Sequence, residues 1–330
     1  MTKQTTSSKR QEFGGNKKKY RVRNWKEYNE ALVQRGSVFF WITEESLKQW
    51  KAPQQEKRKR GRPLLYNTVA IETALTLGQV FHLPLRQIEG FLKSILSKLD
   101  ANCQSPDYST LSKRGTTLTV SIPVRSRNDE PVHIVVDSTG VKVYGEGEWK
   151  VRQHGWSKHR RWKKLHIGAD ENTGDILVGE VTGNDIADCQ MLEPLLNQLP
   201  EHTAIAQVSA DGGYDRRRCY DTLEKHRVAH IAIPPQKNAK IWRHGNTIGS
   251  PHPRDGNLRR IRAVGRKQWK KEINYHRRSL VETAMYRLKT IFSDKVQART
   301  SDNQRTQLLL RCKALNRMTT RGMPESYLVA

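Results

Sequence analysis

The sequence has 330 residues, and its 59 Lys and Arg against 33 Asp and Glu give a formal net charge of +26. Hydrophobic residues make up 35% of it, which is enough for a moderate core, but they nowhere form the run of about 18 apolar residues that a transmembrane helix needs. Because a charge surplus this large opposes compaction unless a polyanion offsets it, the composition favours a nucleic-acid partner and argues against a membrane protein.

Residues 1–63 are rich in Lys and Arg and are expected to form a basic, partly disordered segment. The apolar cluster Val38–Ile42 inside it predicts a strand or a small docking element. Arg60-Gly61-Arg62-Pro63 matches the core of an AT-hook, in which Arg60 and Arg62 would lie in a narrow minor groove of DNA. So short a motif is equally compatible with a basic linker, and either version could contact DNA.

The segment 64–125 is predicted to be helical. Apolar residues recur at helical spacing from Thr68 to Leu99, and Leu83-Pro84 divides this stretch into two helices. Ser105–Arg114 has the pattern of a short capped helix with a basic end. Three consecutive helices suggest a helix-turn-helix unit that binds DNA, although an ordinary helical bundle fits the pattern equally well.

Residues 130–325 alternate between strand and helix patterns, which predicts an α/β domain with a mixed sheet. A basic, irregular insertion at about 236–273 interrupts this domain before a long helix that carries Glu282. The other elements expected are strands at 133–137 and 140–144, a hairpin with its turn at 171–174, a helix capped by Asp188, a strand at 204–211, a helix at 217–227 and a strand at 229–233.

The stretch Trp149–His166 combines basic residues with three tryptophans and contains no acidic residue. This interleaving suits a distorted DNA end with exposed bases, and the candidate contacts are Trp156, Lys158, Arg160 and Arg161. A hairpin whose tryptophans belong to the core is the alternative. No cysteine or carboxylate completes a zinc set with the local histidines, so zinc is not expected. The insertion likewise either guides DNA toward the site or forms a solvated surface.

Two carboxylates, Asp137 and Asp211, end predicted strands, and sites in open α/β sheets form at such ends. Asp215 follows closely enough to support Asp211. At about 100° per residue, four side chains project from one narrow stripe of the predicted helix: Tyr275, Arg278, Glu282 and Lys289. The helix alone would be interpreted as amphipathic with a solvated charged face. The two upstream aspartates instead favour a site formed with Glu282.

Three carboxylates suit phosphodiester chemistry, because two Mg²⁺ ions about 3.5–4 Å apart activate a nucleophile and neutralise the leaving oxygen. Asp137, expected on the central strand, would bridge the two ions, and Mn²⁺ would be an acceptable substitute. Arg278 and Lys289 would grip DNA phosphates beside the metals. Tyr275 would hydrogen-bond a phosphate or stack on a base.

Three stretches of the chain, in this order, resemble insertion-sequence transposases of the DDE type, and most closely the fifth insertion-sequence family. They are Asp137–Gly140, Ala210–Asp215 and a Tyr-(2)-Arg-(3)-Glu-(6)-Lys signature, which Tyr275, Arg278, Glu282 and Lys289 satisfy without departure. The resemblance extends over roughly residues 60–325. It implies a ribonuclease-H-like catalytic core whose metal ligands are Asp137, Asp211 and Glu282. The predicted helical DNA-binding region precedes this core.

The resemblance also implies a function. The enzyme would bind the terminal inverted repeats of its element, cleave the ends by Mg²⁺-dependent hydrolysis and join the 3′-hydroxyl ends to double-stranded target DNA. A dimer or higher multimer is expected, because two ends are joined in concert. The alternatives are a Mg²⁺-dependent nuclease without strand transfer and a non-catalytic DNA-binding regulator, and the intact carboxylate set argues against the regulator. Without a CxxC pair or a signal peptide, a cytoplasmic location at the bacterial nucleoid is expected.

Overall fold

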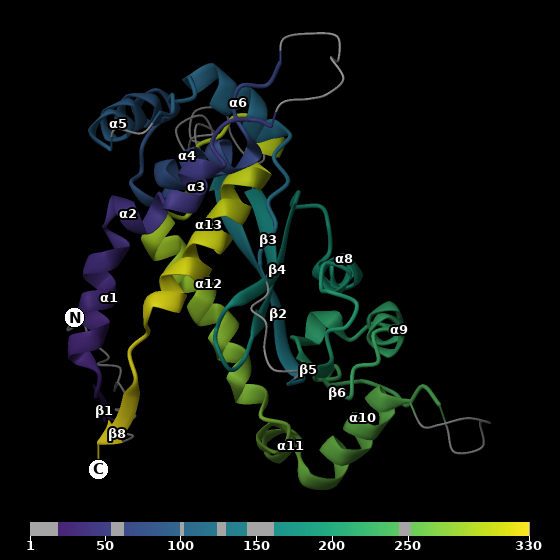
Figure 1. Ribbon diagram of the computed structural model, residues 1–330. Helices are drawn as coiled ribbons and strands as arrows, with labels where there is room; N and C mark the ends of the chain where they lie inside the picture. The colour runs from purple at the N-terminus through teal and green to yellow at the C-terminus, as the bar shows by residue number, and fades with distance from the viewer. Residues whose placement is uncertain are drawn as a thin grey trace, which may run out of the picture.

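The computed structural model describes residues 19–53, 63–99, 102–123, 130–143, 162–243 and 252–329. Figure 1 shows a twisted sheet in the middle of the molecule with helices on both of its faces. The sheet has the strand order β4-β3-β2-β5-β6, and the short strand β7 pairs with the far end of β2. The α/β class and the mixed sheet are thereby confirmed. The strands are β1 (Lys19–Val22), β2 (Val132–Val143), β3 (Trp162–Asp170), β4 (Ile176–Thr182), β5 (Ile205–Ser209), β6 (His230–Ala232), β7 (Lys295–Val296) and β8 (Ser326–Val329).

The central strand β2 sets the topology of the sheet. It pairs antiparallel with β3 and parallel with β5, which in turn pairs parallel with β6. The two strands expected at 133–137 and 140–144 were a wrong prediction, because β2 runs unbroken through Gly140, which stays extended opposite Lys164 of β3. The turn at 171–174 is confirmed, and Gly174 there has a φ of 69°, a conformation that glycine adopts without a Cβ clash.

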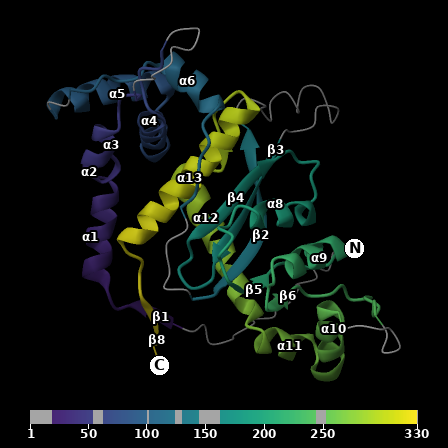
Figure 2. The same ribbon diagram turned by 45° about the vertical axis from the view of Figure 1, so that its right-hand side comes forward.

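Helices cover both faces of the sheet. On one face, Val135, Leu165 and Ile167 pack against α4, α5, α12 and α13. On the other face, α8 and α9 cover a second apolar cluster, and Figure 2 shows them on the side of the sheet away from α13. The α-helices are α1 (Trp25–Arg35), α2 (Val38–Trp41), α3 (Glu44–Lys48), α4 (Thr68–Val80), α5 (Leu85–Lys98), α6 (Tyr108–Thr116), α8 (Leu192–Leu196), α9 (Arg217–Lys225), α10 (Pro253–Val264), α11 (Arg266–Glu272), α12 (Ser279–Phe292) and α13 (Ser301–Arg321).

The three helices predicted between residues 64 and 125 are confirmed as α4, α5 and α6. Pro84 is the N-cap of α5, and the Asp107 carboxylate caps α6 by accepting a 2.7 Å hydrogen bond from the Thr110 N–H. The apolar faces of α4 and α5 belong to the same core as α13 and the sheet. This shared core ties the helices firmly to the rest of the molecule.

The N-terminal part of the described chain forms an arm. Strand β1 pairs with β8, so these two segments lie side by side, and α1 leads from them back to the body (Figure 1). The apolar cluster at 38–42 is not a strand: residues 38–41 form the short helix α2. A strand would point the adjacent side chains of Phe40 and Trp41 to opposite faces, whereas the helix lets both be buried on one side.

The predicted cap at Asp188 was also wrong. Asp188 is the first residue of the 3₁₀ turn η2 (Asp188–Gln190), and α8 begins after it with Met191 at its N-cap. The Asp188 carboxylate instead lies 3.3 Å from Nζ of Lys164 in β3. None of the helices in the described ranges combines the length and apolarity needed to cross a bilayer.

Candidate active site

The register of β2 and β5 places two aspartates at the same level of the sheet. The parallel pairing runs as far as Val135 opposite Ser209, and Asp137 and Asp211 each follow that pair by two residues. Asp137 is therefore not at the end of its own strand, as the sequence had suggested. It lies midway along the 12 residues of β2, and the neighbouring strand β5 is the one that ends. The Asp137 side chain is 19% exposed at this level of the sheet, where the neighbouring strand stops.

A tight turn after β5 holds Asp211. The Oδ1 atom of Asp211 accepts a 2.8 Å hydrogen bond from the backbone N–H of Gly213, within the 3₁₀ turn η3 (Gly212–Tyr214). A Cβ at position 213 would lie only 2.9 Å from that oxygen, so any other residue would displace the carboxylate. Tyr214 is buried in the core beneath and fixes the end of the turn. The local sequence thus determines the orientation of Asp211.

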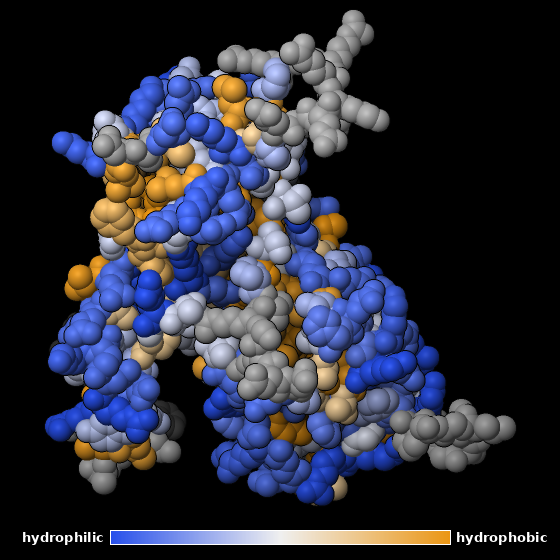
Figure 3. All heavy atoms as spheres, viewed as in Figure 1, coloured by the Kyte–Doolittle hydropathy of each residue, from blue (hydrophilic) through white to orange (hydrophobic). Residues whose placement is uncertain are grey.

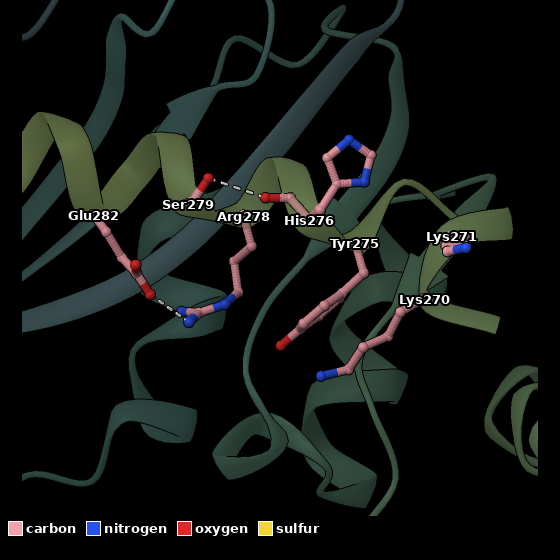
Figure 4. Close-up of a pocket in the computed structure, with 7 residues that line it drawn as sticks. All are labelled: Lys270, Lys271, Tyr275, His276, Arg278, Ser279 and Glu282. Atoms are coloured by element: carbon pink, nitrogen blue, oxygen red, sulfur yellow. Dashed lines mark hydrogen bonds and ion pairs between the residues drawn. The ribbon is translucent and has the colours of Figure 1, made fainter. Parts of the chain in front are cut away.

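The third carboxylate comes from α12. Glu282 lies in the first turn of this helix and its side chain is 53% exposed. Arg278, just before the helix, has Nη1 at 2.7 Å from Oδ2 of Asp137 and Nη2 at 2.5 Å from Oε1 of Glu282. Figure 4 shows the Arg278 and Glu282 side chains directed toward each other. One guanidinium therefore joins the acid on the central strand to the acid on the helix.

The segment that carries these residues is not one α-helix. Residues Tyr275–Arg278 form the 3₁₀ turn η4, which the chain enters through Asn274 with a φ of 53°. Because a 3₁₀ turn has about three residues per turn, side chains there rotate by about 120° rather than 100°. The prediction of one continuous helix was therefore wrong, but three residues at about 120° complete a turn, so Tyr275 and Arg278 stay on the same side and line one cavity with Glu282. The expected buried face is confirmed within α12 at Ala284 and Leu288.

Tyr275 attaches η4 to the end of β5. Its hydroxyl donates a 3.3 Å hydrogen bond to the Ala210 carbonyl, next to Asp211, and its ring lies against Trp269 with centroids 6.2 Å apart. Nζ of Lys270 lies 4.9 Å from the centre of the ring. Burial raises the pKa of Tyr275, and the nearby carboxylates add to this effect, so the phenol stays protonated.

Burial also shapes the charges at the site. Burial is the largest influence on the pKa of Asp137 and raises it, and the charge of Asp211 raises it further. The hydrogen bond from the Ser138 N–H and the charge of Arg278 lower the pKa and so oppose this rise. Burial disfavours the charge on Arg278, but the anionic surroundings outweigh it and raise the pKa of Arg278 above its ordinary value. The guanidinium remains a permanent cation among the carboxylates.

Of the remaining predicted contacts, Lys289 is the one that lies in the described ranges. Lys289 lies two turns beyond Glu282 on α12, and within the described ranges no hydrogen bond or ion pair joins it to the three carboxylates. The other six predicted DNA contacts lie outside the described residues: Arg60, Arg62, Trp156, Lys158, Arg160 and Arg161.

A polar network that the sequence did not reveal lies behind the site. The Nε2 atom of His133 is 2.8 Å from Oγ of Ser209, its Nδ1 contacts the Glu171 carboxylate, and Glu171 also pairs with Arg277. Burial, followed by the charge of Arg277, lowers the pKa of His133 to about 4. The charge of Asp170 opposes this shift, and Arg277 compensates the charge of the adjacent Glu171. A neutral ring with its proton on Nδ1 donates to Glu171 and accepts from Ser209.

We expected Asp215 to support Asp211, but its carboxylate pairs with another residue. Its carboxylate is buried and forms a two-point ion pair with Arg254, with Oδ1 at 2.6 Å from Nε and Oδ2 at 3.2 Å from Nη2. Arg254 also donates to the Lys240 carbonyl and stacks over Trp242 at 4.0 Å. The pair fastens the basic insertion to the chain four residues after Asp211. The sequence did not distinguish Arg254 from the many other basic residues around it.

A cavity of about 280 Å³ adjoins the cluster. Its lining residues, drawn in Figure 4, are Lys270, Lys271, Tyr275, His276, Arg278, Ser279 and Glu282. In the part of the chain that is described, no three His, Cys, Asp or Glu side chains lie close enough together to enclose a metal ion as they stand. The three carboxylates offer the hard oxygen donors that Mg²⁺ prefers, but the Arg278 guanidinium occupies the space between two of them.

A mixed sheet with carboxylates near basic residues, in a chain of net charge +26, is compatible with an enzyme that processes DNA. A family model described as a transposase DDE domain matches residues 128–317, which include all three carboxylates, and a second model with the same description matches residues 33–146. The chain belongs to the DDE transposases. This confirms the resemblance to insertion-sequence transposases, and the second match is consistent with the fifth insertion-sequence family.

Proposed function

We propose that this transposase binds the terminal inverted repeats of its own element, cleaves the ends and joins the freed 3′-hydroxyls to target DNA. The observation that carries the proposal is that the fold brings three acids from separate elements into one region. Asp137 on β2 and Asp211 after β5 share one level of the sheet, and Arg278 links Asp137 to Glu282 on α12. No local feature of the chain would require these acids to converge.

The sheet supports a ribonuclease-H-like core as part of the proposal. Three antiparallel strands, β4, β3 and β2, continue into the parallel strands β5 and β6, with helices on both faces. The central strand carries Asp137, which suits the bridging role assigned to it. Under this proposal residues 130–325 are the catalytic domain, and residues 1–63 and 64–125 supply DNA contacts through the basic segment and helices α4 to α6.

The donor set fits two Mg²⁺ ions once Arg278 releases it. When bound, Mg²⁺ or Mn²⁺ would activate the attacking oxygen and neutralise the leaving oxygen of an in-line displacement. The carboxylates would hold the ions, the Gly213 N–H would keep Asp211 in place, and the cations around the cavity would orient DNA phosphates. We further propose that Lys289 contacts DNA, that the working form is a multimer and that it acts at the nucleoid.

Strand transfer by purified protein, using a pre-cleaved element end, target DNA and Mg²⁺, tests the proposal. Joined product is expected from the wild type and not from Asp211→Asn or Glu282→Gln, which keep the shape of the side chains but lose a charge. Cleavage without joining would support the alternative nuclease. Binding to DNA without either reaction, with Mn²⁺ also tried, would support the regulator.

A further inference from the structure

Arg278 has an unusual place for a residue expected to bind DNA. Its side chain is only 22% exposed, and both of its terminal nitrogens are engaged by carboxylates, those of Asp137 and Glu282. These are two of the three acids proposed to hold metal. The guanidinium therefore already uses oxygens that a divalent ion would need.

The charges explain why the guanidinium lies there. Asp137 and Asp211 at one level of the sheet repel each other, and Asp137 is partly removed from water. A forked guanidinium can satisfy two carboxylates at once, which a lysine ammonium does less well. Arg278 is the cation that pairs with Asp137 and Glu282 in this arrangement.

The cavity next to Arg278 offers the guanidinium a second position. Lys270 and Lys271 line this cavity together with Arg278, and Ser279 adds a hydroxyl. Figure 4 shows that the Tyr275, Lys270 and Arg278 side chains extend to the same side of the chain. A cavity with these cations suits a phosphate group, and a phosphate bound there would compete with Asp137 and Glu282 for Arg278.

We propose that Arg278 is an exchangeable counter-ion that couples DNA binding to metal binding. It bridges Asp137 and Glu282 when the site holds no metal, and it turns to a DNA phosphate in the adjacent cavity when an element end binds. That movement frees the carboxylate oxygens for divalent ions. The inference rests on the proposed function, and it explains how a site built for metal keeps its acids together before DNA arrives.

Mn²⁺ binding without DNA, measured by titration calorimetry at pH 8, tests the first half of the proposal. Arg278→Gln should bind Mn²⁺ about tenfold more tightly than the wild type, because the competing cation is gone. Lys289→Gln is the matched control: it removes one positive charge from α12 without breaking the bridge and should have a smaller effect. Arg278→Lys, which keeps the charge but loses the fork, should fall between them. Thermal unfolding of each variant without metal shows whether it is folded.

Coupling to DNA tests the second half. Ca²⁺, which takes oxygen ligands, should tighten binding of an element-end duplex by the wild type more than by Arg278→Gln. Equal Mn²⁺ affinity for the wild type and a folded Arg278→Gln, or an unchanged Ca²⁺ effect, would overturn the counter-ion role and leave the proposed function standing. Failure of the wild type and all variants to bind Mn²⁺, even with DNA present, would instead overturn the proposed function and the inference together.

Discussion

At the scale of single residues, burial separates the charged groups that hold the structure from those that act at its surface. Arg254 is 4% exposed and its partner Asp215 is 6% exposed, so removing Arg254 would leave the Asp215 carboxylate buried without its cation. The ion pair of Arg260 and Glu272 lies on the surface of the same insertion and is screened by water. The two pairs look alike in the sequence but differ in what they contribute.

Replacing Arg254 should therefore destabilise the protein strongly. Arg254→Gln is expected to lower the free energy of unfolding by about 3–5 kcal/mol, because Asp215 remains buried without a cation. Urea denaturation measures this loss, and Arg260→Gln is the matched control, with a much smaller expected change. Adding Asp215→Asn to Arg254→Gln should recover part of the loss. Equal losses for the two single arginine variants would contradict the anchoring role of Arg254.

At the scale of secondary-structure elements, the sequence predicted what local patterns determine. The helices α4, α5 and α9 have regular apolar spacing, and the hairpin of β3 and β4 has a clear turn, so all were found. The continuity of β2 was missed because Gly140 looks like a break locally, whereas pairing with β3 decides its conformation. The helix carrying Glu282 was found, but not the 3₁₀ turn before it.

The sequence singled out the three acids for a related reason, but it did not predict the contact of Arg278 with two of them. Strand patterns and spacing pointed to Asp137, Asp211 and Glu282 one by one. The contact of Arg278 with two of them depends on the register of β2 against β5 and on the placement of α12, which are properties of the packed fold. The network of His133, Glu171 and Ser209 escaped prediction because its members come from three separate segments.

This network should make stability depend on pH. The pKa of His133 is about 4 in the folded protein and about 6.5 in an unfolded chain, so the unfolded state binds more protons between these values. The contribution of His133 is fully present above pH 6.5 and is lost as the pH falls toward 4. His133→Gln should reduce the acid-induced loss of unfolding free energy over that window by up to about 3 kcal/mol. Parallel pH profiles for wild type and variant would exclude this role.

At the scale of the whole molecule, charge and shape agree with a DNA-processing enzyme. The chain has a charge surplus of +26. Figure 3 shows mostly hydrophilic residues over the lower half of this face, with hydrophobic residues gathered near α2 to α5. The shared core of α4, α5, α13 and the sheet joins the N-terminal helices to the site rather than leaving them as a loose appendage. DNA bound by those helices would therefore be held at a fixed position relative to the active site.

The most direct test of the central claim, that Asp137, Asp211 and Glu282 form one metal site, is cleavage of the protein by its own bound metal. Fe²⁺ replaces Mg²⁺ in the complex with an element-end duplex, and ascorbate with peroxide then generates radicals that cut the nearby backbone. The account predicts cuts close to residues 137, 211 and 282 together, which excess Mg²⁺ suppresses and which Asp211→Asn weakens at all three positions. Cuts clustered elsewhere in the chain, or cuts at one of the three positions alone, would contradict it.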